Sequence, residues 1–187
     1  MSDITTIMSD GVSKMNKAVD VAKEDLASIR TGRAHPSLFN KVIVDYYGAP
    51  TALNQLASVQ VPEARVAIIN PFDKGAMASI EKALRESDLG VNPSNDGVSI
   101  RINFPQLTEE RRKEYIKLAK SKGEDSKVSI RNIRRSVKEA LEKLEKDGAI
   151  SKDDLARAEK ELEKHTGDHT TKIDELLKHK EAELLEV

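Results

Sequence analysis

The sequence predicts an α+β protein in which a long antiparallel three-helix bundle is interrupted by a small inserted α/β domain. The outer parts of the chain carry apolar residues in heptad spacing, which is typical of helices that face other helices. The middle part, from about Arg33 to Phe104, lacks this spacing and holds five of the six prolines, with Pro105 at its exit. Charged residues reach 34% and aromatic residues only 3%, a balance typical of long amphipathic helices. The predicted bundle therefore comprises residues 1–30 and 106–187, and the inserted domain residues 31–105.

The first predicted helix precedes Gly32, which provides a C-terminal stop. Its apolar residues alternate in steps of four and three, and they are Met8, Val12, Met15, Val19, Ala22, Leu26 and Ile29. A single face of this helix is thus expected to pack against two partners.

The other two bundle helices have clear start signals. Thr108 is a good N-cap for a second helix that continues to about Lys146, and Ser151 is a good N-cap for a third. The seam of the third helix consists of Leu155, Ala158, Leu162, Ile173, Leu176 and Leu184. A helix of about 35 residues is about 50 Å long, so the bundle should be slender.

The middle of the chain is predicted to form strands at residues 41–47, 57–61, 65–69 and 98–104, because β-branched residues dominate there. A turn at residues 48–50 and a helix capped by Asp73 lie among them. Two connecting segments must join this domain to the bundle. They suggest a hinge at Thr31, Gly32, Phe104 and Pro105, although ordinary boundary residues explain the same pattern.

The most informative feature for function is a basic stripe on the second helix. Five basic residues follow Asp125 and precede Glu139 with no acid among them, and they fall within about 100° of one helix face. They are Lys127, Arg131, Arg134, Arg135 and Lys138. A charged helix face usually needs no partner, but elsewhere in this chain the helices mix both signs. The stripe therefore predicts a local contact with a polyanion such as RNA.

Composition and motifs exclude several other functions. The net charge of −1 argues against a protein that coats nucleic acid over its whole surface. The absence of cysteine excludes disulfides, zinc ribbons and thiol catalysis, and the N-terminus resembles no secretory signal, so we expect a cytoplasmic protein without a membrane span. No phosphate-binding loop or catalytic set is recognisable. His165 and His169 lack a third metal ligand, so we expect no metal, no cofactor and no enzymatic activity.

Short segments spread in order along the chain resemble the ribosome recycling factor family. They are IRTGRA (29–34), YYG (46–48), QLAS (55–58), SDLGVNP (87–93), LTEERR (107–112) and VSIRNIRR (128–135). His35 and Gln106 depart slightly from the family pattern.

The resemblance implies an L-shaped, non-enzymatic factor whose bundle lies across the tRNA sites of the large ribosomal subunit. With elongation factor G and GTP, such factors split post-termination ribosomes into subunits, so that mRNA and tRNA are released. The inserted domain swings, pushed by that GTPase.

Several site assignments stay open at this stage. Arg131 and Arg134 are the strongest candidates for ribosomal RNA contacts, because a guanidinium group can hold a phosphate through two hydrogen bonds. Arg30 and Arg33 either reach the same RNA or pair with acids nearby. Tyr46 and Tyr47 could stack on bases, but neighbouring strand residues face opposite sides.

A coiled-coil scaffold or assembly chaperone is the alternative function, because heptad seams also serve oligomerisation. If the three seams of one chain satisfy one another, the protein is a monomer.

Overall fold

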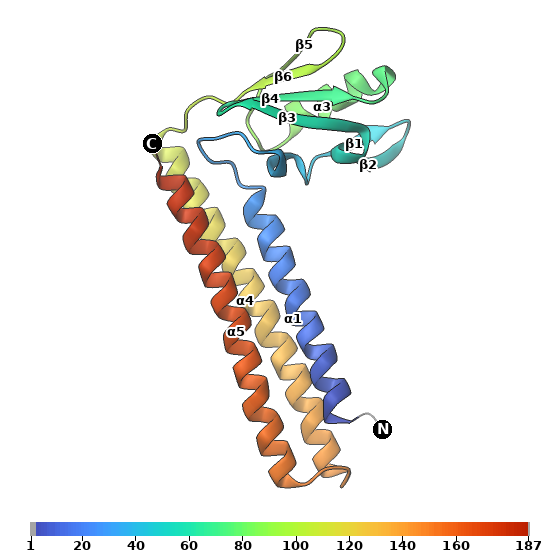
Figure 1. Cartoon of the computed structure of the whole chain (residues 1–187), viewed down its shortest axis with the longest axis vertical. Helices are drawn as coiled ribbons and strands as arrows, with labels where there is room; N and C mark the ends of the chain where they lie inside the picture. The colour runs from blue at the N-terminus through green and yellow to red at the C-terminus, as the bar shows by residue number, and fades with distance from the viewer. Residues whose placement is uncertain (1–2, 187) are drawn as a thin grey trace. The chain divides into compact units, whose positions relative to one another are not determined.

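The computed structural model describes residues 3–186, which divide into two compact units. The helical unit consists of the described chain up to Leu26 together with Leu118–Lys180, and the sheet unit consists of Ala27–Lys117 and the residues from Glu181 on. The long helices are α1 (Ile4–Ala27), α4 (Glu109–Lys146) and α5 (Lys152–Leu185), shown in Figure 1. Within the described residues every helix is too short or too polar to cross a membrane.

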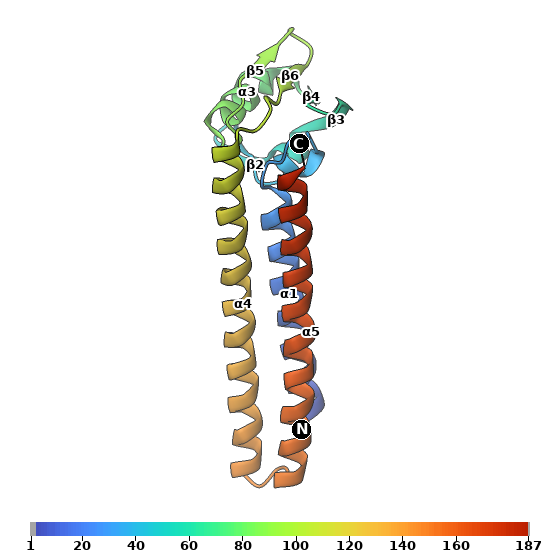
Figure 2. The same ribbon diagram turned by 90° about the vertical axis from the view of Figure 1, so that its left-hand side faces the viewer.

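The helical unit is an antiparallel three-helix bundle, as predicted. Figures 1 and 2 show that α1 and α5 run in one direction and α4 in the opposite one. All three helices contribute to one buried cluster, which contains Met8, Met15, Ala22, Ile130, Val137, Leu141, Ala158, Leu162 and Ile173. Most of these residues belong to the heptad seams, so the fold class predicted for the outer parts of the chain is confirmed.

Two glycines allow the bundle helices to approach closely. A Cβ atom on Gly11 of α1 would lie 2.6 Å from Cγ2 of Val137 on α4. A Cβ atom on Gly123 of α4 would likewise lie 2.6 Å from Cδ1 of Leu177 on α5. Both positions therefore exclude a larger side chain unless the neighbouring residue moves.

The predicted caps are present at the starts of α4 and α5. The hydroxyl of Thr108 accepts a hydrogen bond from the Arg111 amide at 3.2 Å. At α5, the Ser151 hydroxyl accepts from the Asp154 amide at 3.0 Å, and the Asp154 carboxylate accepts from the Ser151 amide at 3.4 Å. This reciprocal pair is a capping box, which satisfies amides that the first turn leaves without partners.

The first helix is shorter than predicted. It ends at Ala27, whereas its heptad pattern continues to Ile29. The carbonyl of Ala27 accepts a hydrogen bond from the Ser37 hydroxyl at 3.2 Å, so a contact from later in the chain satisfies this helix end. Ile29 is still buried, at 5% exposure.

The sheet unit contains a hairpin and a four-stranded antiparallel sheet. The hairpin pairs β1 (Ile43–Tyr46) with β2 (Ala49–Ala52), and a short helix α2 (Leu53–Leu56) follows. The sheet has the order β3-β4-β6-β5. Its strands are β3 (Ala57–Glu63), β4 (Val66–Pro71), β5 (Pro93–Asn95) and β6 (Ile100–Asn103), and helix α3 (Met77–Glu86) lies between β4 and β5 in the chain.

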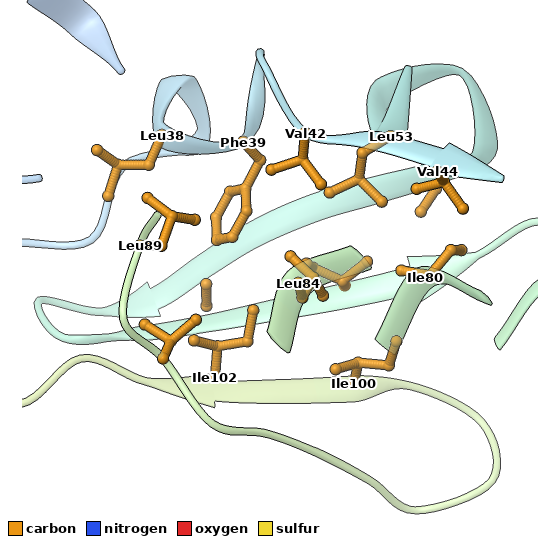
Figure 3. Close-up of a cluster of buried hydrophobic side chains, with 14 of the residues drawn as sticks. Leu38, Phe39, Val42, Val44, Leu53, Ile80, Leu84, Leu89, Ile100 and Ile102 are labelled. Carbon is orange, nitrogen blue, oxygen red and sulfur yellow. The ribbon is translucent and has the colours of Figure 1, made fainter. Parts of the chain in front are cut away.

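The core of the sheet unit is a separate hydrophobic cluster. Figure 3 shows Ile80 and Leu84 of α3 lying between the side chains of residues 38–53 and those of Ile100 and Ile102 on β6. All five labelled side chains of the upper group come from the 3-10 helix η1 (Pro36–Phe39), β1, α2 and the segments between them.

Two strands were not predicted, and proline explains both omissions. Pro50 lies in β2, which pairs only with β1, and Pro93 opens β5 at an edge of the sheet. Proline is tolerated at an edge because its missing amide hydrogen breaks no ladder there. The residues 48–50 that were expected to form a turn therefore enter a strand at Ala49.

Candidate nucleic-acid interface

The basic stripe lies on α4 within the helical unit. The residues that face the bundle core, such as Ile130 and Val137, are buried, while Arg131 is 52% exposed at its side chain and Lys138 45%. Helix α4 thus packs through buried apolar residues and presents cations on another face.

Acidic side chains accompany the stripe in space. Arg131 pairs with Glu124 at 2.5 Å, Arg134 with Glu163 of α5 at 2.8 Å, and Lys127 with Asp174 of α5. Lys138 lies 3.9 Å from Glu142. The Arg131–Glu124 pair is exposed on both sides, and such a pair contributes about 0–1 kcal/mol, whereas the Lys127 side chain is only 23% exposed. Four of the five basic side chains of the stripe are thus paired with an acid of α4 or α5.

Arg135 differs from the other members of the stripe. Its side chain is exposed, and within residues 3–186 no carboxylate pairs with it. It is consequently the arginine that can meet a phosphate without first leaving a partner.

Arg30 is buried rather than displayed. Its exposure is 6%, its guanidinium donates a hydrogen bond to the Pro105 carbonyl, and its Cζ lies 5.4 Å from the centre of the Phe104 ring. Burial lowers the pKa of Arg30, with opposing effects from its neighbours. Its Nε atom has no hydrogen-bond partner among the described residues. This placement favours a role in joining the two connecting segments, and contact with RNA stays a prediction for Arg30.

The remaining residues of the connecting segments lie in different environments. Arg33 is exposed, and its amide donates to the Thr31 hydroxyl at 3.3 Å. A Cβ atom on Gly32 would have no neighbour within 4 Å. Phe104, in contrast, is 2% exposed, and its ring packs edge-on against Phe39 with centres 6.1 Å apart. The predicted hinge thus combines one segment with free space around Gly32 and a second segment in which the ring of Phe104 is buried.

His165 and His169 of α5 lie in the bundle rather than in a cluster of metal ligands. His169 is 4% exposed, with Nδ1 lying 2.6 Å from the His165 carbonyl oxygen and Nε2 lying 2.7 Å from Oδ1 of Asn16 on α1. Between residues 3 and 186 no group of three or more candidate ligands comes together. His169 therefore ties α1 to α5 through polar contacts.

The fold defines a class of protein, namely a mixed α and β protein with a long three-helix bundle that carries a row of basic side chains on α4. Residues 22–185 match the family described as ribosome recycling factor. Proteins named ribosome-recycling factor from Streptomyces coelicolor and Streptomyces avermitilis are 61% and 62% identical over 184 residues, which are 98% of this chain and 100% of those proteins. The chain belongs to the ribosome recycling factor family.

Solved structures that resemble this chain are also ribosome recycling factors. A solution structure of a ribosome recycling factor has a TM-score of 0.78 and 37% identity, with full coverage of both chains. A second neighbour, with a TM-score of 0.68 and 43% identity, covers 98% of this chain and 99% of its own. It is described as models of the T. thermophilus ribosome recycling factor and the E. coli elongation factor G bound to the E. coli post-termination complex. Members of the family are non-enzymatic factors, and elongation factor G provides the GTPase activity.

Proposed function

We propose that this protein, together with elongation factor G and GTP, splits post-termination ribosomes into subunits and so releases mRNA and tRNA. The observation that carries the proposal is family membership over nearly the whole chain at about 60% identity. The structural neighbour seen with elongation factor G on a post-termination complex supports the choice of partner. We propose the cytoplasm as the location, because ribosomes that have finished translation are the substrate.

Within this function, the stripe on α4 is our proposed contact with large-subunit ribosomal RNA across the tRNA sites. The side chains that we propose for this contact are Arg131, Arg134, Arg135, Lys127 and Lys138, with Arg33 as a further candidate and Arg30 in the supporting role described above. Each phosphate that a protein neutralises on RNA contributes about −0.7 to −0.9 to the slope of log K against log salt. Arg131 and Arg134 each exchange a carboxylate for a phosphate, so removing both should change the slope by less than about 2.

The experiment is light scattering of post-termination ribosomes mixed with the protein, elongation factor G and GTP, in which splitting lowers the signal. The test variant carries Arg131→Ala and Arg134→Ala. The control variant carries Arg85→Ala and Arg157→Ala, which removes the same charge from exposed arginines that also pair with acids. We expect splitting by the wild type and the control but not by the test variant.

Each result has a separate meaning. Equal loss in the control would show that net charge rather than the stripe matters. Failure of the wild type with elongation factor G from several sources would reject recycling and favour the scaffold alternative.

We also propose that the protein is a monomer. The shared cluster of α1, α4 and α5 within one chain supports this, because the seams that a scaffold would use for association are already covered. Sedimentation at micromolar concentration tests it, and self-association that is lost when seam residues are changed would contradict it.

Finally, we propose that residues 31–105 form the moving domain and that Thr31, Gly32, Phe104 and Pro105 form its hinge. The chain contains no cysteine, so one cysteine introduced at Lys164 and one at Ser94 can carry spin labels without competing sites. A broad distribution of label distances is expected for a working hinge. A single narrow distance, unchanged when elongation factor G is added, would exclude it.

A further inference from the structure

The turn of the β1–β2 hairpin contains a tyrosine in a backbone conformation that is unfavourable for this residue type. Strands β1 and β2 are joined by only two residues, Tyr47 and Gly48, with φ of 50° and 84°. Positive φ at both positions is the signature of a type I′ turn, for which Asn-Gly is the preferred sequence. Tyr47 is the one residue other than glycine with positive φ in the described part of the chain. A backbone outlier of this kind points to a role for the side chain itself.

The ring of Tyr47 is exposed but held in place. Its residue exposure is 77%, and its hydroxyl donates to Oδ2 of Asp73 at 3.4 Å. The same hydroxyl oxygen lies 2.7 Å from where a Cβ of Gly75 would be, so it rests over a bare stretch of backbone. The ring of Tyr46 contacts it edge-on, with centres 4.6 Å apart. The turn therefore fixes an aromatic surface in solvent rather than leaving it free to rotate.

A second aromatic residue is the sequence neighbour of Asp73. Phe72 directly precedes Asp73 and is 71% exposed. Large aromatic side chains usually bury most of their surface, so two exposed ones, Tyr47 bonded to Asp73 and Phe72 adjacent to it in the sequence, form a candidate contact surface. We call Tyr47, Phe72 and Asp73 the aromatic–acid patch.

The charge of the patch indicates what it can bind. The Gly75 amide and then the hydroxyls of Tyr46 and Tyr47 lower the pKa of Asp73, so this carboxylate is ionised at neutral pH. Asp45 of the same hairpin accepts the Gly48 amide at 2.8 Å and adds a second acid, while Lys74 follows Asp73 in the sequence. A phosphate backbone would be repelled by these acids. Stacking of an RNA base on Tyr47 is thus disfavoured, although exposed aromatic rings alone would permit it.

We propose that the aromatic–acid patch is a docking site for an arginine side chain of a partner protein. A guanidinium group stacks on aromatic faces and pairs with carboxylates, which are the two features that this patch combines. Asp73 can still receive it, because an ionised carboxylate has about four acceptor positions and three of them are used by Gly75, Tyr46 and Tyr47. The inference goes beyond the RNA contact of α4, since it concerns a protein partner and the other unit.

The test is a titration of the full chain, labelled with nitrogen-15, followed by amide chemical shifts. The probe is a short peptide with two arginines flanked by glycines. The matched peptide replaces each arginine by citrulline, which keeps the planar shape and removes the charge. A third probe is a short oligouridine. We expect the arginine peptide to shift the amides of Tyr47, Gly48 and Phe72–Gly75, and to bind about threefold or more tightly than the citrulline peptide.

Two variants separate docking from folding. Tyr47→Asn supplies the residue that the turn prefers, so the thermal midpoint should not fall, while the arginine-induced shifts should be lost. Asp73→Asn keeps an acceptor for the Gly75 amide but removes the charge, and it should abolish the preference for arginine over citrulline. Val98→Ala, which shortens another exposed apolar residue beside an acid, is the control and should leave binding unchanged.

Four results would overturn the proposal. Equal binding of the arginine and citrulline peptides, or no shift at these amides with either, would remove the guanidinium as the ligand. Shifts with oligouridine in place of the arginine peptide would make the patch a nucleic-acid site. A lower thermal midpoint in Tyr47→Asn would show that the tyrosine is retained for stability.

Discussion

Replacing Gly11 by alanine tests how closely α1 and α4 approach. An alanine in the middle of a helix is more favourable than glycine by about 1 kcal/mol, because glycine loses more backbone freedom. At Gly11 this gain is opposed, since the new Cβ would lie 2.6 Å from Cγ2 of Val137. Val137 is 6% exposed and β-branched, so it has essentially one rotamer on a helix and cannot turn away. The helices or the backbone must shift instead, at a cost of about 1–3 kcal/mol.

Gly167 provides the matched control on α5. It is exposed, and a Cβ there would meet nothing within 4 Å. Gly167→Ala should therefore raise the free energy of unfolding by about 1 kcal/mol, whereas Gly11→Ala should leave it unchanged or lower it by up to about 2 kcal/mol. The difference between the two variants, about 1–3 kcal/mol, isolates the contact with Val137, because both share the same gain in helix propensity.

The assay is urea unfolding followed by far-ultraviolet circular dichroism, which reports the helices. For a protein of this size, about 1 kcal/mol also corresponds to a shift of about 2–4 °C in the thermal midpoint. Adding Val137→Ala removes Cγ2, so the penalty of Gly11→Ala should vanish in that background. Equal stabilisation by Gly11→Ala and Gly167→Ala would refute the close approach of α1 and α4.

Three further predictions concern the caps, the pH dependence and the second core. Ser151→Ala should lower the free energy of unfolding by about 1 kcal/mol in urea, because the Asp154 amide loses its acceptor, and an unchanged midpoint would exclude the capping box. The side chain and then the amide of Ser151 lower the pKa of Asp154, so its stabilising effect is complete above the unfolded pKa of about 3.8 and is lost as pH falls through the lower folded value. Acid titration should therefore show that the difference in free energy of unfolding between wild type and Asp154→Asn shrinks below about pH 4. A difference that grows there would contradict a lowered pKa of Asp154. Ile100→Ala should destabilise the sheet unit by about 2–5 kcal/mol, measured as faster amide exchange in β4 and β6, and a greater effect in α1 would argue against separate cores.

The sequence predicted the bundle better than the sheet, for a physical reason. A heptad seam repeats many times along a helix, so single exceptions such as Gly123 do not hide it. Strands β2 and β5 have only four and three residues, and each includes a proline, so little periodicity exists to detect. Their place at an edge, where proline is tolerated, is decided by pairing with distant strands.

The stripe on α4 was predicted from the sequence, but its acidic partners were not. Glu163 and Asp174 reach Arg134 and Lys127 because of how α5 is rotated against α4, and no local pattern encodes that rotation. Arg30 illustrates the same limit. Its partner is a backbone carbonyl 75 residues away, and a carbonyl carries no signal in the sequence. The residue therefore looked equally suited to RNA and to a structural contact.

The order of the two cores along the chain has a consequence for how the protein is made. The core of the sheet unit is drawn entirely from residues 34–104, so it can close as soon as that stretch has left the ribosome. Helix α1 emerges before it, yet its apolar seam has no cover until α4 and α5 follow. At the usual speed of synthesis this interval lasts on the order of ten seconds. The nascent chain therefore exposes the apolar seam of α1 after the sheet unit has folded and before α4 and α5 are available. A chaperone that covers Met8, Met15 and Ala22 would act during this interval.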